Sequence, residues 1–594
     1  MARRLVAIVP CALVLAVPAA AQSRVVPNVA NRCVAMRGVA GGPFHFKPSG
    51  LGTYLISARD GKLLGGPQAE WLIDSHGRGG VRIVPRGGGR ALRVRRLRVV
   101  RTCTRFPEAD VGATGRPFRG PRRGPVRGFA DPHMHLAAEL RAGGRVIAGS
   151  SYDRFGIPAA LGRDADVHGE DGGMDITGNL LRSGSPTGTH DTHGWPTFTG
   201  WPTFDTYTHH QIYYRWLERA WRAGWRLIGA QVIEDAPLCE IEPSRSHSCD
   251  ETETAELQVE RLRGLEDYVD AQAGGRGRGW LRIVTSPGEA RRVIRRGKLA
   301  VFLAFESSDP FGCALRQGMP QCDRAGIDRG IERLRALGIR SMFLAHWVDN
   351  ALAGAALEGG DKGSFIAAMQ VSYTGAPFVT GPCPHPGQGD EPAGTGALTG
   401  PQCNAKGLTE LGEYAVGRMM DRHMLIEVDH LSERARERVL ALAEARGYPL
   451  VSSHTGTGGR WDESELRRLQ ALGGFAAATL DDAVKLPDKV LAFRRLGFAS
   501  VGLATDIGGF AALPAPDKDH RLEYPFLCQA GDVRLARQRT GERTFDINTD
   551  GVAHYGLLPD LLALTKQQPR GAEAVDDLFG SAEAYLRMWE GAAG

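Results

Sequence analysis

The chain has 594 residues, including 78 glycines and 10 cysteines, and its 73 basic and 67 acidic side chains give a net charge of +6. Hydrophobic residues at 42% and charged residues at 24% are ordinary globular values, which excludes wholesale disorder. A charge of +6 over this length is weak and does not indicate a nucleic-acid binder.

Residues 1–21 have the layout of a secretory signal peptide. Two arginines precede an apolar run, and small residues lead up to a cleavage site near Ala21. The run is too short and wrongly flanked for a spanning helix, and no later stretch approaches 18 apolar residues. We therefore expect no transmembrane segment and a soluble protein that is secreted or periplasmic.

Residues 22–105 contain short apolar alternations broken by glycine, which predict a small all-β module. Residues 106–126 are rich in glycine, proline and arginine, a composition typical of a linker. This part of the chain leaves open a contact with carbohydrate or another cell-surface polymer, although a solvated basic surface is the simpler interpretation of its arginines.

From residue 127 to residue 594, short apolar runs alternate with amphipathic helical stretches. Eight strands alternating with helices predict a (β/α)8 TIM barrel, with an open doubly wound sheet as the competing α/β architecture. One helix has a recognisable start, because Ser286, Pro287 and Glu289 form the pattern of a capping box. The eight runs cover residues 128–135, 225–234, 299–307, 339–347, 424–430, 449–455, 474–479 and 500–509.

Nine cysteines follow the signal peptide, and their spacing is typical of an oxidising compartment. Three short-range pairs flank polar loops, a fourth pair brackets the β module, and Cys528 is left over. A structural zinc site is the alternative, although the chain has no CxxC motif. The predicted disulfide pairs are Cys33 with Cys103, Cys239 with Cys249, Cys313 with Cys322, and Cys383 with Cys403.

Polar side chains stand at the carboxyl ends of seven of the eight runs. In a barrel these ends form the active site, and a polar side chain buried there is costly unless it is paired or bound to a metal. Each residue alone has an ordinary interpretation, such as a hydrogen-bonded core histidine or a helix cap. Together, four histidines and two carboxylates suffice for two divalent metal ions, and imidazole suits zinc. The residues in chain order are His133 with His135, Glu234, Glu306, His346, His430, His454 and Asp506.

This order of residues resembles the amidohydrolase superfamily, which has HxH on the first strand, histidines on the fifth and sixth, and an aspartate on the eighth. Glu306 on the third strand resembles the bridging glutamate of the membrane (renal) dipeptidase branch. The similarity runs from about residue 128 to residue 510 and leaves out the β module. The stretches that carry it are FLAFES, MFLAHWVDN, GLTELGEYAVGRMMDRHMLIEVDHLS, PLVSSHT and VGLATDIGG.

The resemblance implies a binuclear site, with zinc as the expected metal and a hydroxide bridging the two ions. Glu306 bridges the ions, His346 binds substrate and donates to the developing oxyanion, and Asp506 accepts the proton of the attacking water. Arg460, six residues after His454, is a candidate for binding a substrate carboxylate, with an exposed arginine at a helix start as the plainer interpretation. One ion is expected on His133, His135, Glu306 and Asp506, and the other on Glu306, His430 and His454.

The sequence also departs from the dipeptidases, which carry HxD on the first strand where this chain has His133 and His135. Long insertions at 136–224 and 348–423 fall at the active-site end. His190 and His193 lie in the first of them and are weak candidates for lining the pocket. The segment 544–560 offers further polar residues, which either contribute near the site or pack the end of the barrel: Asp550, Gly551 and His554.

The leading hypothesis is an exported metal-dependent hydrolase that cleaves the amide bond of a dipeptide or an N-acyl amino acid, a small-molecule substrate. A second hypothesis keeps the metals and changes the bond to a lactone or a phosphoester, which the first-strand HxH keeps open. A third is a secreted binding protein with a relic barrel, whose β module recognises carbohydrate. The sequence predicts no oligomeric state.

Overall fold

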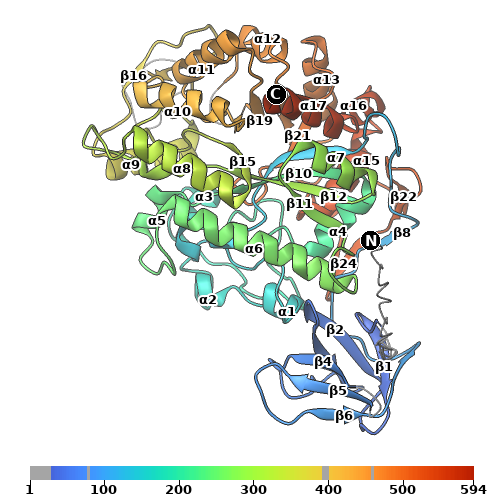
Figure 1. Ribbon diagram of the computed structural model, residues 1–594. Coiled ribbons are helices and arrows are strands. Elements are labelled where there is room, and N and C mark those ends of the chain that lie inside the picture. Colours follow the sequence, from blue (N-terminus) through green and yellow to red (C-terminus); the bar gives the residue numbers. More distant parts are fainter. Residues whose placement is uncertain (1–27, 77–79, 391–400, 457–459) are drawn as a thin grey trace, which may run out of the picture. The chain divides into compact units, whose positions relative to one another are not determined.

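A computed structural model describes residues 28–76, 80–390, 401–456 and 460–594 (Figure 1). The predicted signal peptide lies outside these residues. The chain divides into two compact units, the first reaching to Lys47 and continuing over Thr53–Arg105, the second made of Pro48–Gly52 and Phe106–Gly594. Within the described residues, no helix is both long and apolar enough to cross a membrane.

The first unit is a seven-stranded sheet in the order β6-β5-β4-β3-β2-β1-β7. Its core is small and is formed by Val34, Phe44, Phe46, Ile56 and Ile83, each at most 1% exposed. The strands are β1 (Arg32–Met36), β2 (Phe44–Gly50), β3 (Thr53–Ser57), β4 (Trp71–His76), β5 (Gly80–Pro85), β6 (Leu92–Val94) and β7 (Leu97–Val100). The predicted β-rich character of this part of the chain is thus observed.

The second unit is a mixed α/β structure built on parallel strands. One sheet has the order β18-β15-β12-β10-β9, with β11 pairing on β12, and a second sheet has the order β19-β20-β21. Each of the eight predicted apolar runs contains one strand, whereas β11 was not predicted. The strands are β9 (Phe129–Met134), β10 (Trp225–Val232), β11 (Leu281–Val284), β12 (Leu299–Phe305), β15 (Ile339–Met342), β18 (Leu425–Ile426), β19 (Val451–Thr455), β20 (Phe475–Thr479) and β21 (Gly502–Ala504).

The two parallel sheets are linked at both of their edges. Glu427, directly after β18, forms a parallel bridge with Val451 of β19. At the other edge, the amide of Asp506 donates to the carbonyl of His133 at 3.0 Å, and the amide of His135 donates to the carbonyl of Ile507 at 3.0 Å. The chain beyond β21 therefore runs beside the end of β9, which brings the first and last predicted strands together.

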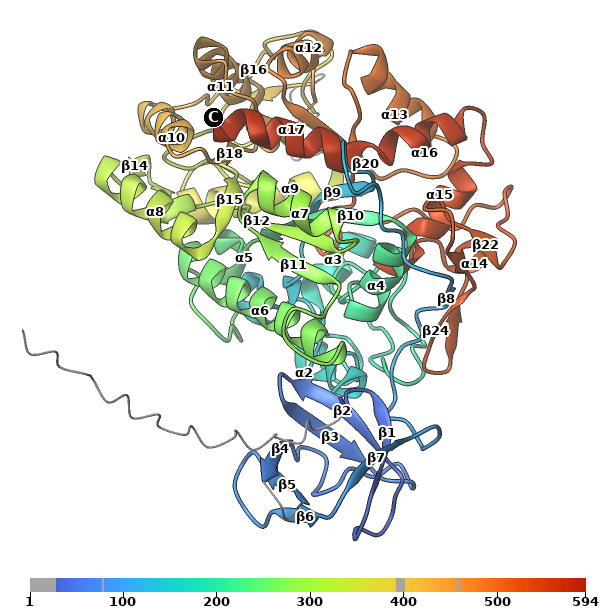
Figure 2. The same cartoon turned by 45° about the vertical axis from the view of Figure 1, so that its right-hand side comes forward.

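Helices cover the strands of the second unit (Figures 1 and 2). Helix α7 begins as predicted, because the Ser286 hydroxyl accepts from the amide of Glu289 and Pro287 is its first residue. The major helices are α4 (Tyr214–Ala223), α6 (Glu251–Gln272), α7 (Pro287–Arg295), α8 (Arg324–Leu337), α10 (Glu410–Asp421), α11 (Glu433–Arg446), α12 (Glu463–Ala471), α13 (Leu486–Arg495), α15 (Leu558–Thr565), α16 (Gly571–Leu578) and α17 (Ser581–Ala593).

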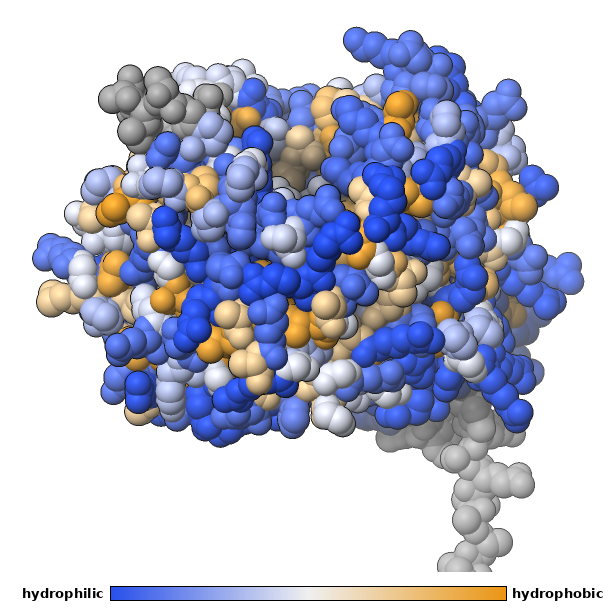
Figure 3. Space-filling view, turned by 90° about the horizontal axis from the view of Figure 1, so that it is seen from above, coloured by the Kyte–Doolittle hydropathy of each residue, from blue (hydrophilic) through white to orange (hydrophobic). Residues whose placement is uncertain are grey.

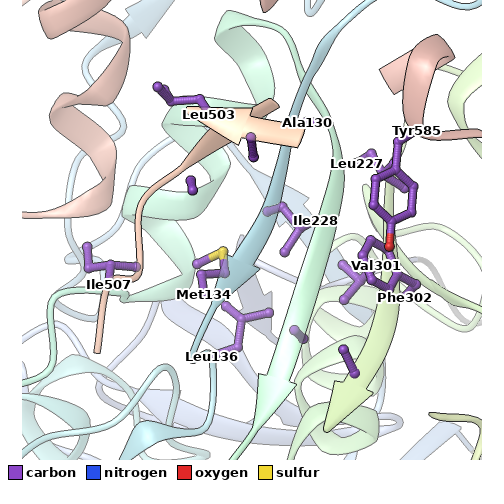
Figure 4. Packing of buried hydrophobic residues seen from close by; sticks show 14 of the residues in the cluster. Ala130, Met134, Leu136, Leu227, Ile228, Val301, Phe302, Leu503, Ile507 and Tyr585 are labelled. Carbon is purple, nitrogen blue, oxygen red and sulfur yellow. The ribbon is translucent and has the colours of Figure 1, made fainter. Parts of the chain in front are cut away.

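Apolar side chains on β9, β10, β12 and β21 form the core between strands and helices (Figure 4). Tyr585 of α17 stacks on Phe302 of β12 with ring centroids 4.7 Å apart. Side chains alternate along a strand, so Met134 enters this core while its neighbours His133 and His135 point to the opposite side of β9. The same strands thus present apolar residues to the helices and polar residues to the site.

The insertions and the segment 106–126 pack on the second unit with little regular structure. Segment 106–126, expected to be a linker, contains β8 (Ala113–Thr114), which pairs with β23 (Arg534–Leu535). The insertions carry α2 (Ala165–His168), α3 (Ile176–Ser183) and α9 (Gly360–Thr374), whereas α5 (Ala236–Ile241) follows β10. Hydrophilic residues cover most of the face in Figure 3, with hydrophobic residues scattered among them.

All four predicted disulfides are confirmed, and Cys528 is a free, buried thiol. Cys33–Cys103 closes the first unit, and the other three staple separate loops of the second. Those three are Cys239–Cys249, Cys313–Cys322 and Cys383–Cys403.

Candidate metal centre

Six polar side chains from five different strands converge at one end of the second unit. They are the predicted metal ligands, and all but Asp506 are at most 3% exposed, with the side chain of Asp506 at 15%. The histidine pair belongs to β9 and the loop behind it, Glu306 directly follows β12, and the others stand at the ends of β18, β19 and β21. The converging residues are His133, His135, Glu306, His430, His454 and Asp506.

One carboxylate oxygen of Glu306 faces the first-strand histidines. Glu306 Oε2 lies 3.5 Å from His133 Nε2 and 3.4 Å from His135 Nε2. Asp506 Oδ1 lies 3.6 Å and 3.3 Å from the same two nitrogens. The two carboxylate oxygens therefore face the same two imidazole nitrogens.

The other oxygen of Glu306 faces a separate group of imidazoles. Glu306 Oε1 lies 3.3 Å from His430 Nε2 and 4.0 Å from His454 Nε2, and these two nitrogens are 2.8 Å apart. His346 Nε2 is 3.7 Å from the same oxygen. Glu306 thus stands between two groups of nitrogen atoms, with one oxygen turned to each.

The donor set fits divalent cations. His133 Nε2 and Glu306 Oε1 are buried without a hydrogen-bond partner, although each points into the cluster. Such orphaned atoms are costly unless an ion occupies the space between them. Imidazole and carboxylate ligands suit zinc, which binds both at about 2.0–2.2 Å. His133, His135, Glu306 and Asp506 could hold one ion.

Electrostatics keep the carboxylates of the centre ionised. Burial alone would raise the pKa of Glu306, but the charges of His346 and His133 hold it well below its ordinary value. Burial also opposes the charged form of His133, yet Glu306 raises the pKa of this imidazole to about 9. Burial and the charge of His346 lower the pKa of His430 to about 4. The cluster therefore combines anionic oxygens with at least one imidazole that is neutral at pH 7, as metal binding requires.

Hydrogen bonds from outside the centre orient three of its imidazoles. His133 Nδ1 lies 3.1 Å from Ser453 Oγ, and His454 Nδ1 lies 3.3 Å from Asp429 Oδ2. Such contacts fix the ring so that Nε2 faces inward. His346 Nδ1 is 2.8 Å from Asp235 Oδ1, which leaves its Nε2 toward Glu306.

Asp235 is a site residue that sequence reasoning missed. It is fully buried, and Arg141 Nε donates to its other oxygen at 3.2 Å. Burial would raise the pKa of Asp235, but the charges of Arg141 and His346 hold it at about 2. The predicted neighbour Glu234 instead accepts from the amide of Gly143 at 2.7 Å. The only sequence signal for Asp235 was its place directly after a strand end.

Two of the converging residues have an unusual backbone. His430 and Asp506 adopt left-handed φ angles of 61° and 47°, and Asp235 does so as well, at 61°. Non-glycine residues held there cost roughly 1–3 kcal/mol and cluster at functional sites. Gly509 makes the Asp506 geometry possible, because a Cβ at Gly509 would lie 1.7 Å from Asp506 Oδ1.

Lys362 and Glu358 form a second group that the sequence did not predict. Lys362 Nζ lies 3.4 Å from Glu358 Oε1 at the start of α9, and its side chain is 28% exposed. Burial lowers the pKa of Lys362, but the charges of Glu358 and Asp506 raise it above its ordinary value. The charges of Lys362 and His430 in turn lower the pKa of Glu358 against its burial. These two side chains therefore lie within electrostatic reach of the centre.

Arg460 has different surroundings. Its side chain is 61% exposed and lies 3.4 Å from Asp390, while its carbonyl accepts from Arg436. No contact between Arg460 and the six converging residues occurs among the described parts of the chain. Its predicted role in substrate binding stays a prediction.

The remaining sequence candidates pack away from the centre. His554 is buried, stacks on Trp216 with centroids 4.3 Å apart, and lies 3.2 Å from Gln538. Asp550 pairs with Arg543 at 2.8 Å. These contacts agree with the packing interpretation. His193 is 67% exposed beside Asp191, whereas His190 enters a second cluster of imidazoles.

Comparison with known proteins gives one family match. Residues 388–462 match the family model of the membrane dipeptidases, peptidase family M19. No curated protein is significantly similar to the chain in sequence.

Several solved structures are similar at a low level. An amidohydrolase from Pseudomonas aeruginosa is 12% identical over 62% of this chain and 90% of that chain, with a TM-score of 0.36. A metallopeptidase from Rhodobacter sphaeroides, liganded with a phosphinate mimic of the dipeptide L-Ala-D-Ala, is 14% identical over 62% and 87%, with a TM-score of 0.36. The probable dipeptidase PvdM from Pseudomonas aeruginosa is 14% identical over 64% and 89%, with a TM-score of 0.36. Similarity of this size assigns no residue of this chain to a role.

The matched family segment contains His430 and His454, two of the imidazoles that face Glu306 Oε1. Sequence pattern and family match therefore point to the same part of the chain. Together they support a divergent, membrane-dipeptidase-like amidohydrolase, which is a metal-dependent hydrolase.

Proposed function

We propose that the protein is an exported binuclear metal-dependent hydrolase that cleaves the amide bond of a dipeptide or an N-acyl amino acid. The observation that carries this proposal is the position of Glu306, whose two oxygens face two separate groups of ligand atoms at 3.3–4.0 Å. A carboxylate that bridges two ions has this arrangement. The proposed metal is zinc, because the ligands are imidazole and carboxylate.

A closed (β/α)8 barrel is the architecture proposed for the second unit. The edge links between β18 and β19, and between β21 and β9, support closure of the eight parallel strands in chain order. In such a barrel the carboxyl ends of all strands face one opening, which accounts for ligands that are as far apart in sequence as His133 and Asp506.

Two divalent cations bound at this centre would lower the pKa of water from about 15.7 towards about 7 and polarise the scissile carbonyl. The chain's own residues supply the proton transfers. Asp506 is proposed to accept the proton of the attacking water and to pass it to the leaving amine. Its side chain is suited to this role because it is ionised and, at 15%, the most exposed of the six.

His346 is proposed to stabilise the oxyanion that develops on the substrate carbonyl. Asp235 accepts a hydrogen bond from His346 Nδ1 and keeps the ring oriented with Nε2 toward the centre. When the ring carries a hydrogen on both nitrogens, its Nε2–H can donate to an oxyanion. A donor in this role contributes roughly 3 kcal/mol to transition-state stabilisation in comparable sites.

Two positively charged side chains are candidates for binding the free carboxylate of the substrate. Arg460 is the candidate from the sequence, and Lys362 is the candidate from the structure. Lys362 is the better of the two, because the charges of Asp506 and Glu306 act on it, whereas the contacts of Arg460 are with Asp390 and Arg436. We assign Lys362 this role.

Export is supported by the four disulfides, which persist in oxidising compartments. The signal peptide at residues 1–21 and its cleavage near Ala21 remain part of this proposal. Carbohydrate or cell-surface binding is the role proposed for the β module, on the sequence argument alone.

A lactonase or phosphoesterase with the same centre is the second candidate. The observation that favours it is the pair His133 and His135, where the dipeptidase branch has HxD. A relic barrel is disfavoured, because all six ligand side chains are present and converge.

The test is to measure metal content and turnover of the purified protein on dipeptides, N-acyl amino acids, lactones and phosphoesters. The variant Glu306→Gln is expected to lose at least one of two metal equivalents and nearly all activity. Glu433→Gln is the matched control, because Glu433 is also buried but does not face the centre, and burial raises its pKa. Two metals and full turnover in Glu306→Gln would contradict the binuclear assignment. Turnover of lactones alone would favour the second candidate.

A further inference from the structure

A second cluster of ligand-type side chains lies in the first insertion, in addition to the strand-end centre. Three imidazole nitrogens converge on one carboxylate oxygen of Asp164. The distances to Asp164 Oδ2 are 2.7 Å from His190 Nε2, 2.6 Å from His209 Nε2 and 3.4 Å from His168 Nδ1. The Nε2 atoms of His190 and His209 are 3.2 Å apart.

We propose that Asp164, His168, His190 and His209 bind a further divalent cation, with zinc as the ion that best suits the set, and that this ion fixes the fold of residues 136–213. Zinc binds histidine nitrogens and carboxylate oxygens, and four such ligands match its tetrahedral coordination. Ligand atoms on such an ion are on the order of 3.3 Å from one another. All four atoms of the cluster lie within 4.8 Å of one another.

The surrounding hydrogen bonds favour a cation over a simple hydrogen-bonded network. His168 Nε2 lies 3.0 Å from the carbonyl oxygen of Val146, so Nε2 carries the hydrogen and the lone pair of Nδ1 points at Asp164 when the ring is neutral. A lone pair and a carboxylate repel each other unless a cation lies between them. Asp164 Oδ1, the second oxygen, is buried without any hydrogen-bond partner.

The cluster is closed, which favours a structural ion over a catalytic one. The side chains of Asp164, His168 and His209 are at most 2% exposed, and that of His190 is 13% exposed. Trp201 stacks on the His209 ring with centroids 4.9 Å apart and covers it. Four protein ligands leave no open position for substrate on a tetrahedral ion.

Residues 136–213 have few other features that would fix their fold, so a metal ion would be an important cross-link there. In residues 136–213, all of which the structure describes, the regular elements are short, and the longest is α3 with eight residues. No disulfide occurs in residues 136–213, whereas three other loops of this unit each have one. The ligands span residues 164–209, so an ion would close a loop of 46 residues. Where a segment has little core of its own, metal binding supplies folding free energy.

The proposed ion would also stabilise chain segments that lie near the strand-end centre. The insertion begins directly after His135, and its His210, which follows the ligand His209, lies 3.1 Å from Glu139. The amide of Ala148 donates to the carbonyl of Thr208, and the amide of His210 donates to the carbonyl of Ala148. An ion on His209 would therefore also hold the isolated bridge between Ala148 and His209 in place.

The first experiment compares metal content in full-length wild type, His190→Gln and His193→Gln after dialysis against buffer with trace zinc. His193 is the matched control, because it lies three residues away but is exposed and outside the cluster. We expect His193→Gln to equal wild type and His190→Gln to hold about one equivalent less. Equal content in all three proteins would overturn the proposal. Glu306→Gln separates this site from the strand-end centre, because its loss should add to that of His190→Gln.

Two further measurements keep the test decisive if His190→Gln does not fold. Zinc-edge anomalous diffraction from wild-type crystals should show a peak among the four ligand atoms. A peak at the strand-end centre together with none at Asp164 would overturn the proposal. In solution, zinc should protect residues 136–213 of Glu306→Gln from limited proteolysis, and unchanged cleavage with and without zinc would also contradict it.

Discussion

Glu306 is the residue whose carboxylate lies between the two groups of imidazole nitrogens in the strand-end centre. Its Oε2 lies near the nitrogens of His133 and His135, and its Oε1 lies near those of His430 and His454. A shorter Asp could not reach both groups, and an amide would present an NH2 group to one of them. In the proposed binuclear site, the identity of this one side chain would therefore determine whether two ions can bind together.

At the same scale, substitutions of Lys362 and Arg460 should have different effects on substrate binding. Replacing Lys362 by Met should raise KM for substrates with a free carboxylate roughly 10- to 100-fold, because a charge-assisted hydrogen bond of about 1.5–3 kcal/mol is lost. Arg460→Ala should leave KM unchanged. Steady-state kinetics on a dipeptide and on its carboxyl-terminal amide measure both effects, and only the free acid should respond. A rise of KM in Arg460→Ala alone would return the role to Arg460.

A single buried acid should also give the stability a pH dependence. Burial raises the pKa of Glu234 to about 9, above the ordinary value near 4.5. Because the folded-state pKa is the higher one, the stabilising contribution is complete below about pH 4.5 and is lost as the pH rises towards 9. The free energy of unfolding should fall by up to about 1.4 kcal/mol per pH unit from this group.

The variant Glu234→Gln should lose this part of the pH dependence of the free energy of unfolding, because Gln does not titrate. Its side-chain oxygen can still accept from the amide of Gly143, so the local structure should be kept. Denaturant unfolding at pH 6, 7 and 8 measures the slopes of both proteins. Glu463→Gln, on an exposed side chain, is the control and should leave the slope as in wild type. Parallel slopes for wild type and Glu234→Gln would show that Glu234 is ionised in the folded protein.

At the scale of elements, the turn after β21 leaves no room for a side chain at Gly509. Gly509→Ala would place a Cβ 1.7 Å from Asp506 Oδ1, so the aspartate has to move. We expect kcat to fall at least about 100-fold, the size of a general acid–base contribution, with the overall fold retained. Gly288→Ala in α7 is the control, because its Cβ would meet only the end of the Arg292 side chain, at 3.6 Å. Wild-type kcat in Gly509→Ala would argue against a role for Asp506 in proton transfer.

The eight central strands could be predicted because each is a short apolar run, and seven of the eight runs have a polar residue behind them. Strand β11 was missed, since its four residues LRIV include an arginine and are too few to show a period. Helices α2 and α3 of the insertion were missed for the same reason. They are short, and they lie in a segment without hydrophobic periodicity.

Six predicted ligands converge because parallel strands end on the same side. Asp235 escaped prediction because alternation along β10 favours Glu234, whereas the left-handed backbone at Asp235 turns its side chain to His346 instead. Lys362 lies in an insertion, where no strand end marks its position. The second imidazole cluster was missed as well, since its residues are spread over 164–209 without a motif spacing.

At the scale of the whole molecule, the strand-end centre joins segments that the chain keeps far apart. Its ligands extend from His133 to Asp506, whereas the disulfides close only local loops of the second unit. Bound ions would therefore be the cross-links of longest range in that unit. The first unit has its own core and its own disulfide and contributes no ligand to the centre.

Removing metal should consequently loosen the second unit at its strand ends and leave the first unit unchanged. Ions present at 1,000 times their dissociation constant stabilise the folded state by about 4 kcal/mol, and a chelator removes that contribution. Hydrogen exchange with mass spectrometry should show lost protection in peptides covering 129–136, 425–431, 451–455 and 502–510. Peptides covering 32–100 serve as the internal control, and added zinc should restore the original protection. If hydrogen exchange in the strand-end peptides stayed the same after complete metal removal, the protein alone would hold the centre together. The ions would then serve catalysis without supporting the fold.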